Sequence, residues 1–121
     1  MCDTDTPAQA RGWSVEHIGE LLPSHIAVPI IDDATLVISE LLTNALLAGC
    51  HSATLELAVE TGTLRVSVLD DAPGEPHVVQ AKPEDAHGRG LWLVAAIARD
   101  WGVTFLGQRK RVWAELPLAL W

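Results

Sequence analysis

The spacing of hydrophobic and polar positions changes at about residue 50. Before this point, apolar residues recur every three or four positions, which is the period of a helix with one buried face. The pattern predicts a short helix over residues 15–22. A longer helix is predicted to begin at Asp32 or Asp33 and to end at Gly49. Because proline interrupts helices, Pro29 is expected to lie in the connector between the two.

After residue 50 the hydrophobic positions alternate, which is the period of a strand with one buried face. The predicted elements are strands over residues 53–59, 64–68, 103–106 and 112–116 and a helix over residues 91–99. The first two strands are expected to form a β-hairpin, and Gly102 to end the helix. The acidic, proline-rich stretch between Asp70 and His87 is expected to form a loop. Helices that are segregated from hairpin-built strands predict the α+β class, here a two-layer α/β sandwich with a mainly antiparallel sheet.

The length of 121 residues fits a flexible lead-in over residues 1–11 and one folded domain over residues 12–121. The chain carries 16 acidic against 8 basic residues, a formal net charge of -8, which repels nucleic-acid phosphates and anionic membrane surfaces. The first residues have no features of a secretory signal, and no apolar run is long enough to span a bilayer. These features predict a cytoplasmic protein that binds neither nucleic acid nor membranes directly.

Glu40 and Asn44 are the first candidate site residues, because residues four apart on a helix share one face. The amide oxygen of Asn44 is a hard ligand of the kind that Mg²⁺ prefers, and Mg²⁺ often takes only one or two protein ligands when phosphates and water supply the others. A glutamate one turn earlier can accept the proton of an attacking hydroxyl. The alternative is that both residues only form the polar stripe of an amphipathic helix.

Asp70 and Gly74 follow the second predicted strand and are candidates for contact with a nucleobase. A carboxylate in a pocket can accept a hydrogen bond from the exocyclic amine of adenine, and a glycine lets the backbone approach the ring. The alternative is that Asp70 only forms a turn.

The run Gly88-Arg89-Gly90-Leu91 places glycines directly before an apolar helix. Free backbone N–H groups at a helix start form a site for anions such as phosphate. The same glycines can equally form a flexible hinge.

Taken in order, these motifs resemble three sequence boxes of one known superfamily. Glu40-Leu41-Leu42-Thr43-Asn44-Ala45, Asp70-Asp71-Ala72-Pro73-Gly74 and Gly88-Arg89-Gly90-Leu91 resemble its N, G1 and G2 boxes. The superfamily, called GHKL, contains gyrase, histidine kinases and the MutL repair proteins. The downstream segments Trp101-Gly102-Val103 and Val112-Trp113-Ala114-Glu115-Leu116 are similar to its anti-sigma-factor serine/threonine kinase branch. The resemblance covers roughly residues 12–117.

The resemblance implies a fold, two cofactors and roles for the site residues. The fold would be the Bergerat-type ATP-binding sandwich, and the cofactors would be ATP and Mg²⁺. Glu40 would be the catalytic base, Asn44 would bind Mg²⁺ and nucleotide, and Asp70 would contact adenine. The nucleotide loops would be formed by Gly74, Gly88, Arg89, Gly90 and Leu91.

The resemblance also implies a regulatory function with protein partners. The protein would bind and sequester a sigma factor, phosphorylate an anti-sigma antagonist on serine, and form a homodimer. The alternative is an ATP-dependent protein-binding module without phosphoryl transfer. Departures from the family pattern favour this alternative. Ala72 stands where the G1 box has glycine, and Lys110-Arg111-Val112 stands where relatives often carry a threonine near the adenine.

Overall fold

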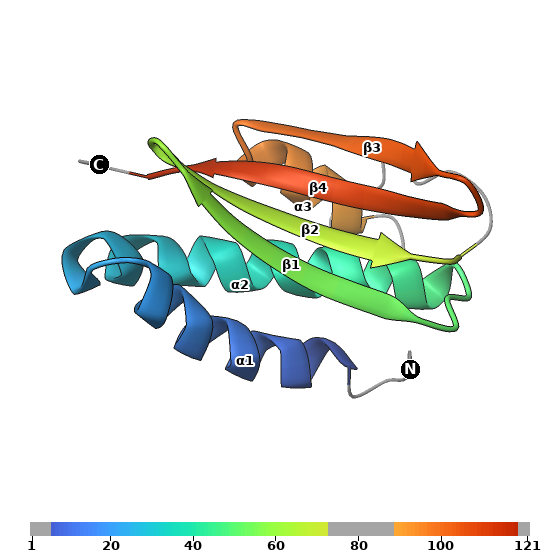
Figure 1. The fold of residues 1–121 in the computed structure, drawn as a ribbon, viewed down its shortest axis with the longest axis horizontal. Coiled ribbons are helices and arrows are strands. Elements are labelled where there is room, and N and C mark those ends of the chain that lie inside the picture. Colours follow the sequence, from blue (N-terminus) through green and yellow to red (C-terminus); the bar gives the residue numbers. More distant parts are fainter. Residues whose placement is uncertain (1–5, 73–88, 119–121) are drawn as a thin grey trace.

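A computed structural model describes residues 6–72 and 89–118 and shows helices beside a four-stranded sheet (Figure 1). The elements in chain order are α1 (Thr6–Leu21), α2 (Ser24–Leu47), β1 (Ala53–Glu60), β2 (Thr63–Asp70), α3 (Arg89–Ile97), β3 (Asp100–Leu106) and β4 (Arg109–Pro117). The strand order is β1-β2-β4-β3, and every pairing is antiparallel. The expected α+β sandwich with an antiparallel sheet is confirmed.

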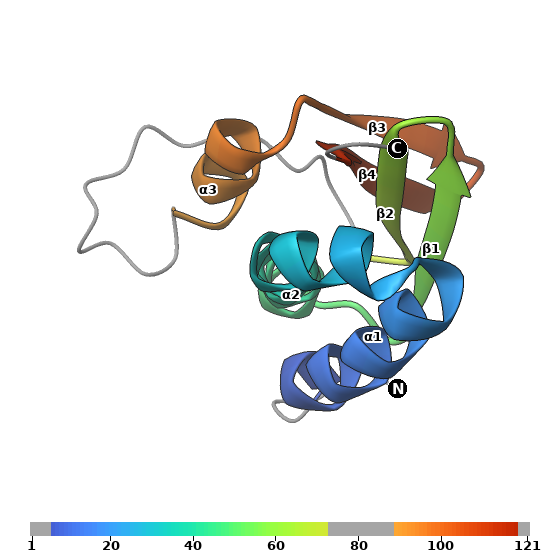
Figure 2. The ribbon, with the colours of Figure 1, turned by 90° about the vertical axis from the view of Figure 1, so that its left-hand side faces the viewer.

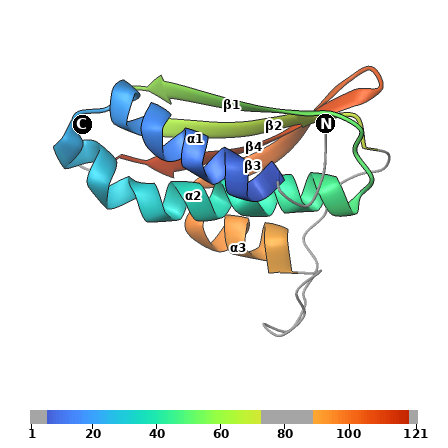
Figure 3. The same cartoon turned by 90° about the horizontal axis from the view of Figure 1, so that it is seen from below.

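The described helices lie on one and the same face of the sheet (Figure 2). α2 lies along this face between α1 and α3 (Figures 2 and 3). Alternation along the two central strands turns every second side chain toward the helices. The core therefore consists of α2 residues packed on these inward positions: Val37, Ile38 and Leu41 on the helix, Leu64, Val66 and Val68 on β2, and Val112, Ala114 and Leu116 on β4.

The first helix begins earlier than the hydrophobic pattern predicts. α1 starts at Thr6, so the expected lead-in over residues 1–11 extends too far, and residues 6–11 are helical. Pro7 lies in the first helical turn, where a proline is tolerated because the N–H it lacks would have no partner within the helix. Arg11, in the second turn of α1, ties this helix to α2, because its Nη1 donates to Ser39 Oγ at 2.7 Å.

The second helix also begins earlier, and the expectation of a connector around Pro29 is wrong. α2 runs without interruption from Ser24 to Leu47 with Pro29 inside it. Pro29 lies just beyond the first turn and forfeits one backbone hydrogen bond, the one to His25. Ile26, Ile30 and Ala34 recur every four residues on the buried face, and their burial holds this part of the chain in the helix.

The β-hairpin is confirmed, whereas Gly102 does not end a helix. β1 and β2 pair from Ala53↔Asp70 to Glu60↔Thr63, and Gly62 turns the chain with φ 72°. α3 ends at Ile97, and Gly102 lies inside β3, directly opposite Trp113 of β4. No helix in the described ranges 6–72 and 89–118 has the length and apolar character needed to cross a membrane.

We expect Gly102→Ala to lower the free energy of unfolding by about 1–3 kcal/mol, the usual cost of overpacking. A Cβ at this position would lie 2.6 Å from Trp113 Cζ2 and 2.9 Å from Trp113 Cε2. The Trp113 indole also contacts Arg65, whose guanidinium carbon lies 4.5 Å from the ring centroid. Either β3 or the indole must therefore move. Urea denaturation measures the change.

Gly19→Ala is the matched control for this substitution. Gly19 is exposed on α1, and a Cβ there would meet nothing within 4 Å. Alanine favours a helix over glycine by about 1 kcal/mol, so Gly19→Ala should leave stability unchanged or raise it. Equal stability of Gly102→Ala and the wild type would show that the indole has room to give way.

Candidate functional site

Asp70 and Lys110 form a buried ion pair on the helix-covered face of the sheet. Asp70 continues the inward series of β2, and Lys110 lies directly opposite it on β4. The distance from Lys110 Nζ to Asp70 Oδ1 is 2.7 Å, and the two residues are 3% and 0% exposed. Lys110 Nζ also donates to the carbonyl of Ala72 at 3.0 Å, and the Ala72 N–H donates to Asp70 Oδ1 at 2.8 Å.

The second carboxylate oxygen of Asp70 has no hydrogen-bond partner among the described residues. Asp70 Oδ2 is buried and, among the side-chain atoms of the described residues, is the one buried nitrogen or oxygen without a hydrogen bond. An orphaned buried acceptor costs free energy, so such atoms are rare unless a ligand or water serves them. Asp70 is therefore ready to accept a hydrogen bond from a ligand, as the exocyclic amine of adenine would provide.

Glu40 and Asn44 lie one turn apart near the end of α2. Glu40 is 8% exposed and belongs to the buried face of the helix, while Asn44 is half-buried. In the part of the chain that the structure describes, neither side chain makes a hydrogen bond or ion pair. The reading of these residues as a solvent-exposed stripe therefore does not fit Glu40, since only 8% of its surface is exposed.

The two parts of the candidate site lie at the same end of the molecule. The carboxyl-terminal ends of α2 and β2 lie close together in Figure 1. Asp71, next to Asp70, ties them: its Oδ1 accepts the backbone N–H of His51 at 2.7 Å and that of Ser52 at 3.1 Å. These two residues belong to the connection between α2 and β1. The Asp71 carboxylate therefore holds the Asn44 end of the helix against the Asp70 end of the strand.

These hydrogen bonds make one acid-sensitive contribution to stability. Those from Ser52 and His51 lower the pKa of Asp71 below its ordinary value of 3.8. Because the folded-state pKa is the lower one, the charged carboxylate stabilises the fold above pH 3.8, and this contribution is lost as the pH falls through the folded pKa. Asp71→Asn keeps an acceptor oxygen but removes the charge. We expect it to lower the Tm at neutral pH by a margin that narrows in acid.

Thermal unfolding followed by circular dichroism from neutral to strongly acidic pH measures this margin. Asp33→Asn is the control, since Asp33 is exposed and makes no contact with a charged or hydrogen-bonding group of the described residues. If the Tm difference between Asp71→Asn and the wild type stays constant as the pH falls, the charge of Asp71 does not contribute to stability.

The remaining predicted residues lie at or beyond the edge of the described chain. Arg89, Gly90 and Leu91 form the first turn of α3, so the helix begins two residues before the predicted start at Leu91, and Arg89 and Gly90 lie inside it. Gly74 and Gly88 lie outside the described residues. The predicted loop between Asp70 and His87 lies almost wholly outside them as well.

Magnesium and ATP are compatible with the groups that are present. The described residues contain no group of three or more histidine, cysteine or acidic side chains placed to hold a metal ion by themselves. A cation here would therefore rely on phosphate and water oxygens, with Asn44 adding an amide oxygen, which is the coordination that Mg²⁺ favours. Asp70 Oδ2, which no donor of the described residues engages, could accept a hydrogen bond from the nucleobase.

Lys110 is a residue of the candidate site to which the sequence analysis assigned no role. In the sequence it stands out only as a departure from the family pattern. The two-residue period of the strand nevertheless indicates that its side chain points toward the core. Val112, Ala114 and Leu116 are the inward positions of β4, and Lys110 continues that series. A lysine at the core-facing end of a strand requires a buried partner, and the strand-end Asp70 is the natural one.

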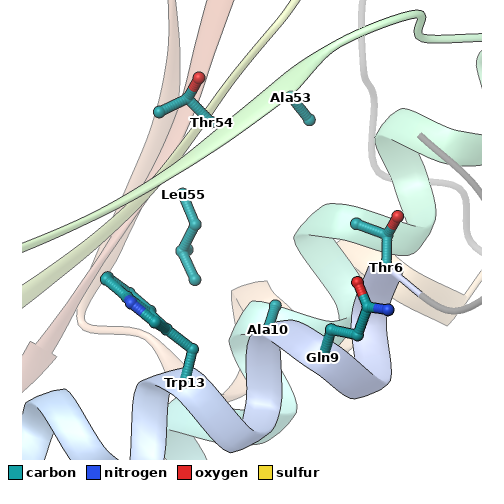
Figure 4. A pocket seen from close by; sticks show the side chains of 7 residues that line it. All are labelled: Thr6, Gln9, Ala10, Trp13, Ala53, Thr54 and Leu55. Carbon is teal, nitrogen blue, oxygen red and sulfur yellow. The ribbon is translucent and has the colours of Figure 1, made fainter. Parts of the chain in front are cut away.

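A separate pocket of about 390 Å³ lies between α1 and β1 (Figure 4). Its lining residues are Thr6, Gln9, Ala10, Trp13, Ala53, Thr54 and Leu55. None of the predicted site residues lines it, so it is not part of the arrangement around Asp70.

Comparisons with known proteins place this geometry in a family. The chain is similar to the blue-light activated histidine kinase of Erythrobacter litoralis EL346, with a TM-score of 0.55 and 31% identity over 76% of this chain and 31% of that one. It is also similar to the histidine kinase domain from the same protein, with a TM-score of 0.51 and 25% identity over 93% of this chain and 61% of that one. The chain thus spans less than two thirds of either structure.

A search of curated proteins found no match. The family model for the histidine kinase-like ATPase domain matches residues 6–115, which includes nearly all of the described chain. The chain belongs to the histidine kinase-like ATPase domain family.

Proposed function

We propose that this protein binds Mg-ATP where α2 and β2 end together and transfers the γ-phosphate to a serine of a protein partner. The observation that carries the nucleotide assignment is Asp70 Oδ2, a buried acceptor without a partner among the described residues. The exocyclic amine of adenine would satisfy it. Family membership supports ATP as the nucleotide.

The residues of α2 support a transfer reaction as well as binding. Mg²⁺ bound through the Asn44 amide oxygen would neutralise phosphate charge during transfer. The Glu40 carboxylate forms no ion pair within the described residues and would accept the proton of the attacking serine hydroxyl. The serine oxygen then bonds to the γ-phosphorus, the bond between that phosphorus and the bridging oxygen breaks, and ADP leaves with the electron pair. A module that only holds nucleotide has no need of a base here.

The partners are proposed from the resemblance to the anti-sigma-factor branch. On that reading, a homodimer of this cytoplasmic protein sequesters a sigma factor and phosphorylates an anti-sigma antagonist on serine. The family assignment supports only the ATP-binding part of this reading, and the similar solved structures are histidine kinases. The chemical nature of the phosphorylated residue is therefore the point to test.

The test uses purified protein, ATP carrying a radiolabelled γ-phosphate, Mg²⁺ and a candidate antagonist protein. We expect label on the antagonist that survives acid, because phosphoserine is an ester, whereas the phosphoramidate of phosphohistidine is cleaved by acid. Acid-labile label would replace the serine kinase by a histidine kinase. Binding of ATP and ATP-dependent capture of a partner without any label would leave the binding module instead.

A further inference from the structure

We infer that Lys110 is a specificity-determining residue that reads the nucleobase together with Asp70. Its ammonium donates a hydrogen bond to the adenine ring nitrogen that neighbours the exocyclic amine bound by Asp70. This inference rests on the proposed function, since it requires that Asp70 meets adenine.

The hydrogen-bonding capacity of the ion pair is only partly used. A lysine ammonium has three N–H donors and no acceptor. In the described chain, two of these donors are engaged, by Asp70 Oδ1 at 2.7 Å and the Ala72 carbonyl at 3.0 Å. Lys110 is 3% exposed, so its remaining N–H has little access to water. The pair therefore offers one free donor on Lys110 beside one free acceptor on Asp70, the buried Oδ2.

The free donor and the free acceptor lie next to each other. Asp70 and Lys110 are directly opposite in the β2–β4 ladder, and both continue the inward positions of their strands. They are joined through Asp70 Oδ1, so Oδ2 and the ammonium are neighbouring groups of one cluster. A ligand edge that presents a donor beside an acceptor would satisfy both at once.

Adenine has such an edge on either side of its amine. The amine is a donor, and the ring nitrogens N1 and N7 that flank it are acceptors. Guanine carries a carbonyl oxygen at the position of the amine, which would set an acceptor against Asp70 Oδ2. A site with buried polar groups rejects a ligand that leaves them unpaired. The pair therefore favours adenine, and Lys110 adds a second point of recognition that a lone carboxylate lacks.

The burial of a lysine at this position supports a role in recognition. Removing two charges from water is expensive, and well-packed apolar residues of the same volume usually stabilise a core at least as well as a buried ion pair. The neighbouring inward positions on β2 and β4 are indeed apolar: Val68 and Val112 are both buried. The charged pair includes Asp70 Oδ2, the buried acceptor without a partner among the described residues. Ligand binding therefore explains a charged pair at this position better than folding stability does.

The experiment is a calorimetric titration of the wild-type protein with Mg²⁺ and four nucleotides: ATP, 1-deaza-ATP, 7-deaza-ATP and purine riboside triphosphate. The last lacks the exocyclic amine and reports on Asp70. We expect one of the deaza analogues to bind about tenfold or more weakly than ATP, because it loses a hydrogen bond to a charged donor. Which analogue is affected identifies the ring nitrogen.

Lys110→Met then removes the donor while keeping the length of the side chain. In this variant, ATP and the affected deaza analogue should bind equally. Arg109→Met is the matched control, because Arg109 is an exposed neighbour on β4 and its loss changes the net charge by the same amount. Arg109→Met should keep the wild-type preference.

The outcomes separate this inference from the proposed function. If the wild type binds ATP and discriminates against purine riboside triphosphate but binds both deaza analogues as tightly as ATP, Lys110 does not read the base. If the wild type binds no ATP, the proposed function and this inference fail together. The analogue series on the wild type decides the matter even if Lys110→Met does not fold.

Discussion

Glu40→Gln is expected to lower the rate of phosphoryl transfer by about a hundredfold or more while leaving ATP affinity unchanged. Glutamine keeps the shape and hydrogen-bonding capacity of the side chain but lacks the basic carboxylate. The substitution therefore removes proton acceptance without disturbing the packing of α2, where Glu40 is 8% exposed. Transfer is measured with radiolabelled ATP and the antagonist, and affinity by calorimetric titration.

Asn44→Ala should produce a different pattern, because the two residues are given different roles on one helical face. Loss of the amide oxygen removes a proposed ligand of Mg²⁺, so Mg²⁺-dependent nucleotide affinity and transfer should fall together. Glu20→Gln is the control: Glu20 is exposed on α1 and should change neither quantity. Equal transfer by Glu40→Gln and the wild type would remove Glu40 from the reaction and favour a binding module.

The fold was predictable wherever a single period governs a segment. The alternation from residue 53 to residue 68 reflects burial on one face of the sheet, and the hairpin followed from it. Single-residue breaker signals were less dependable. Pro29 and Gly102 were each interpreted as interruptions, and each lies inside an element. Burial of the neighbouring turns of α2 outweighs the local preference of Pro29. Pairing of β3 with β4 outweighs that of Gly102.

The candidate site was predictable only as far as its motifs extend. The predicted elements contain the three motif residues: Glu40 and Asn44 lie in α2, and Asp70 ends β2. A short motif is predictable in this way because it lies within one helix or at the end of one strand. The partner of Asp70 lies 40 residues away in sequence and enters through strand pairing. No local pattern specifies that β4 rather than β3 lies beside β2, so the contact with Lys110 required the sheet order.

Lys110→Met should therefore have a second large effect, on stability: a loss of about 3–5 kcal/mol in the free energy of unfolding. The substitution leaves the Asp70 carboxylate in a fully buried position with only the Ala72 N–H as a donor among the described residues. A buried charge that loses its counter-charge pays its desolvation without compensation. Urea denaturation of the nucleotide-free protein measures the loss, and Arg109→Met should change stability little.

The double variant Asp70→Asn with Lys110→Met distinguishes charge from packing. Asparagine is close to aspartate in shape but neutral, so the buried charge disappears and most of the lost stability should return. The pair is also shielded from solvent, with exposures of 0% and 3%, so the effect of Lys110→Met should persist at high salt, unlike that of a surface pair. A double variant as unstable as the single one would mean that Lys110 stabilises the fold through its methylenes and the Ala72 carbonyl, and that its charge is not what Asp70 requires.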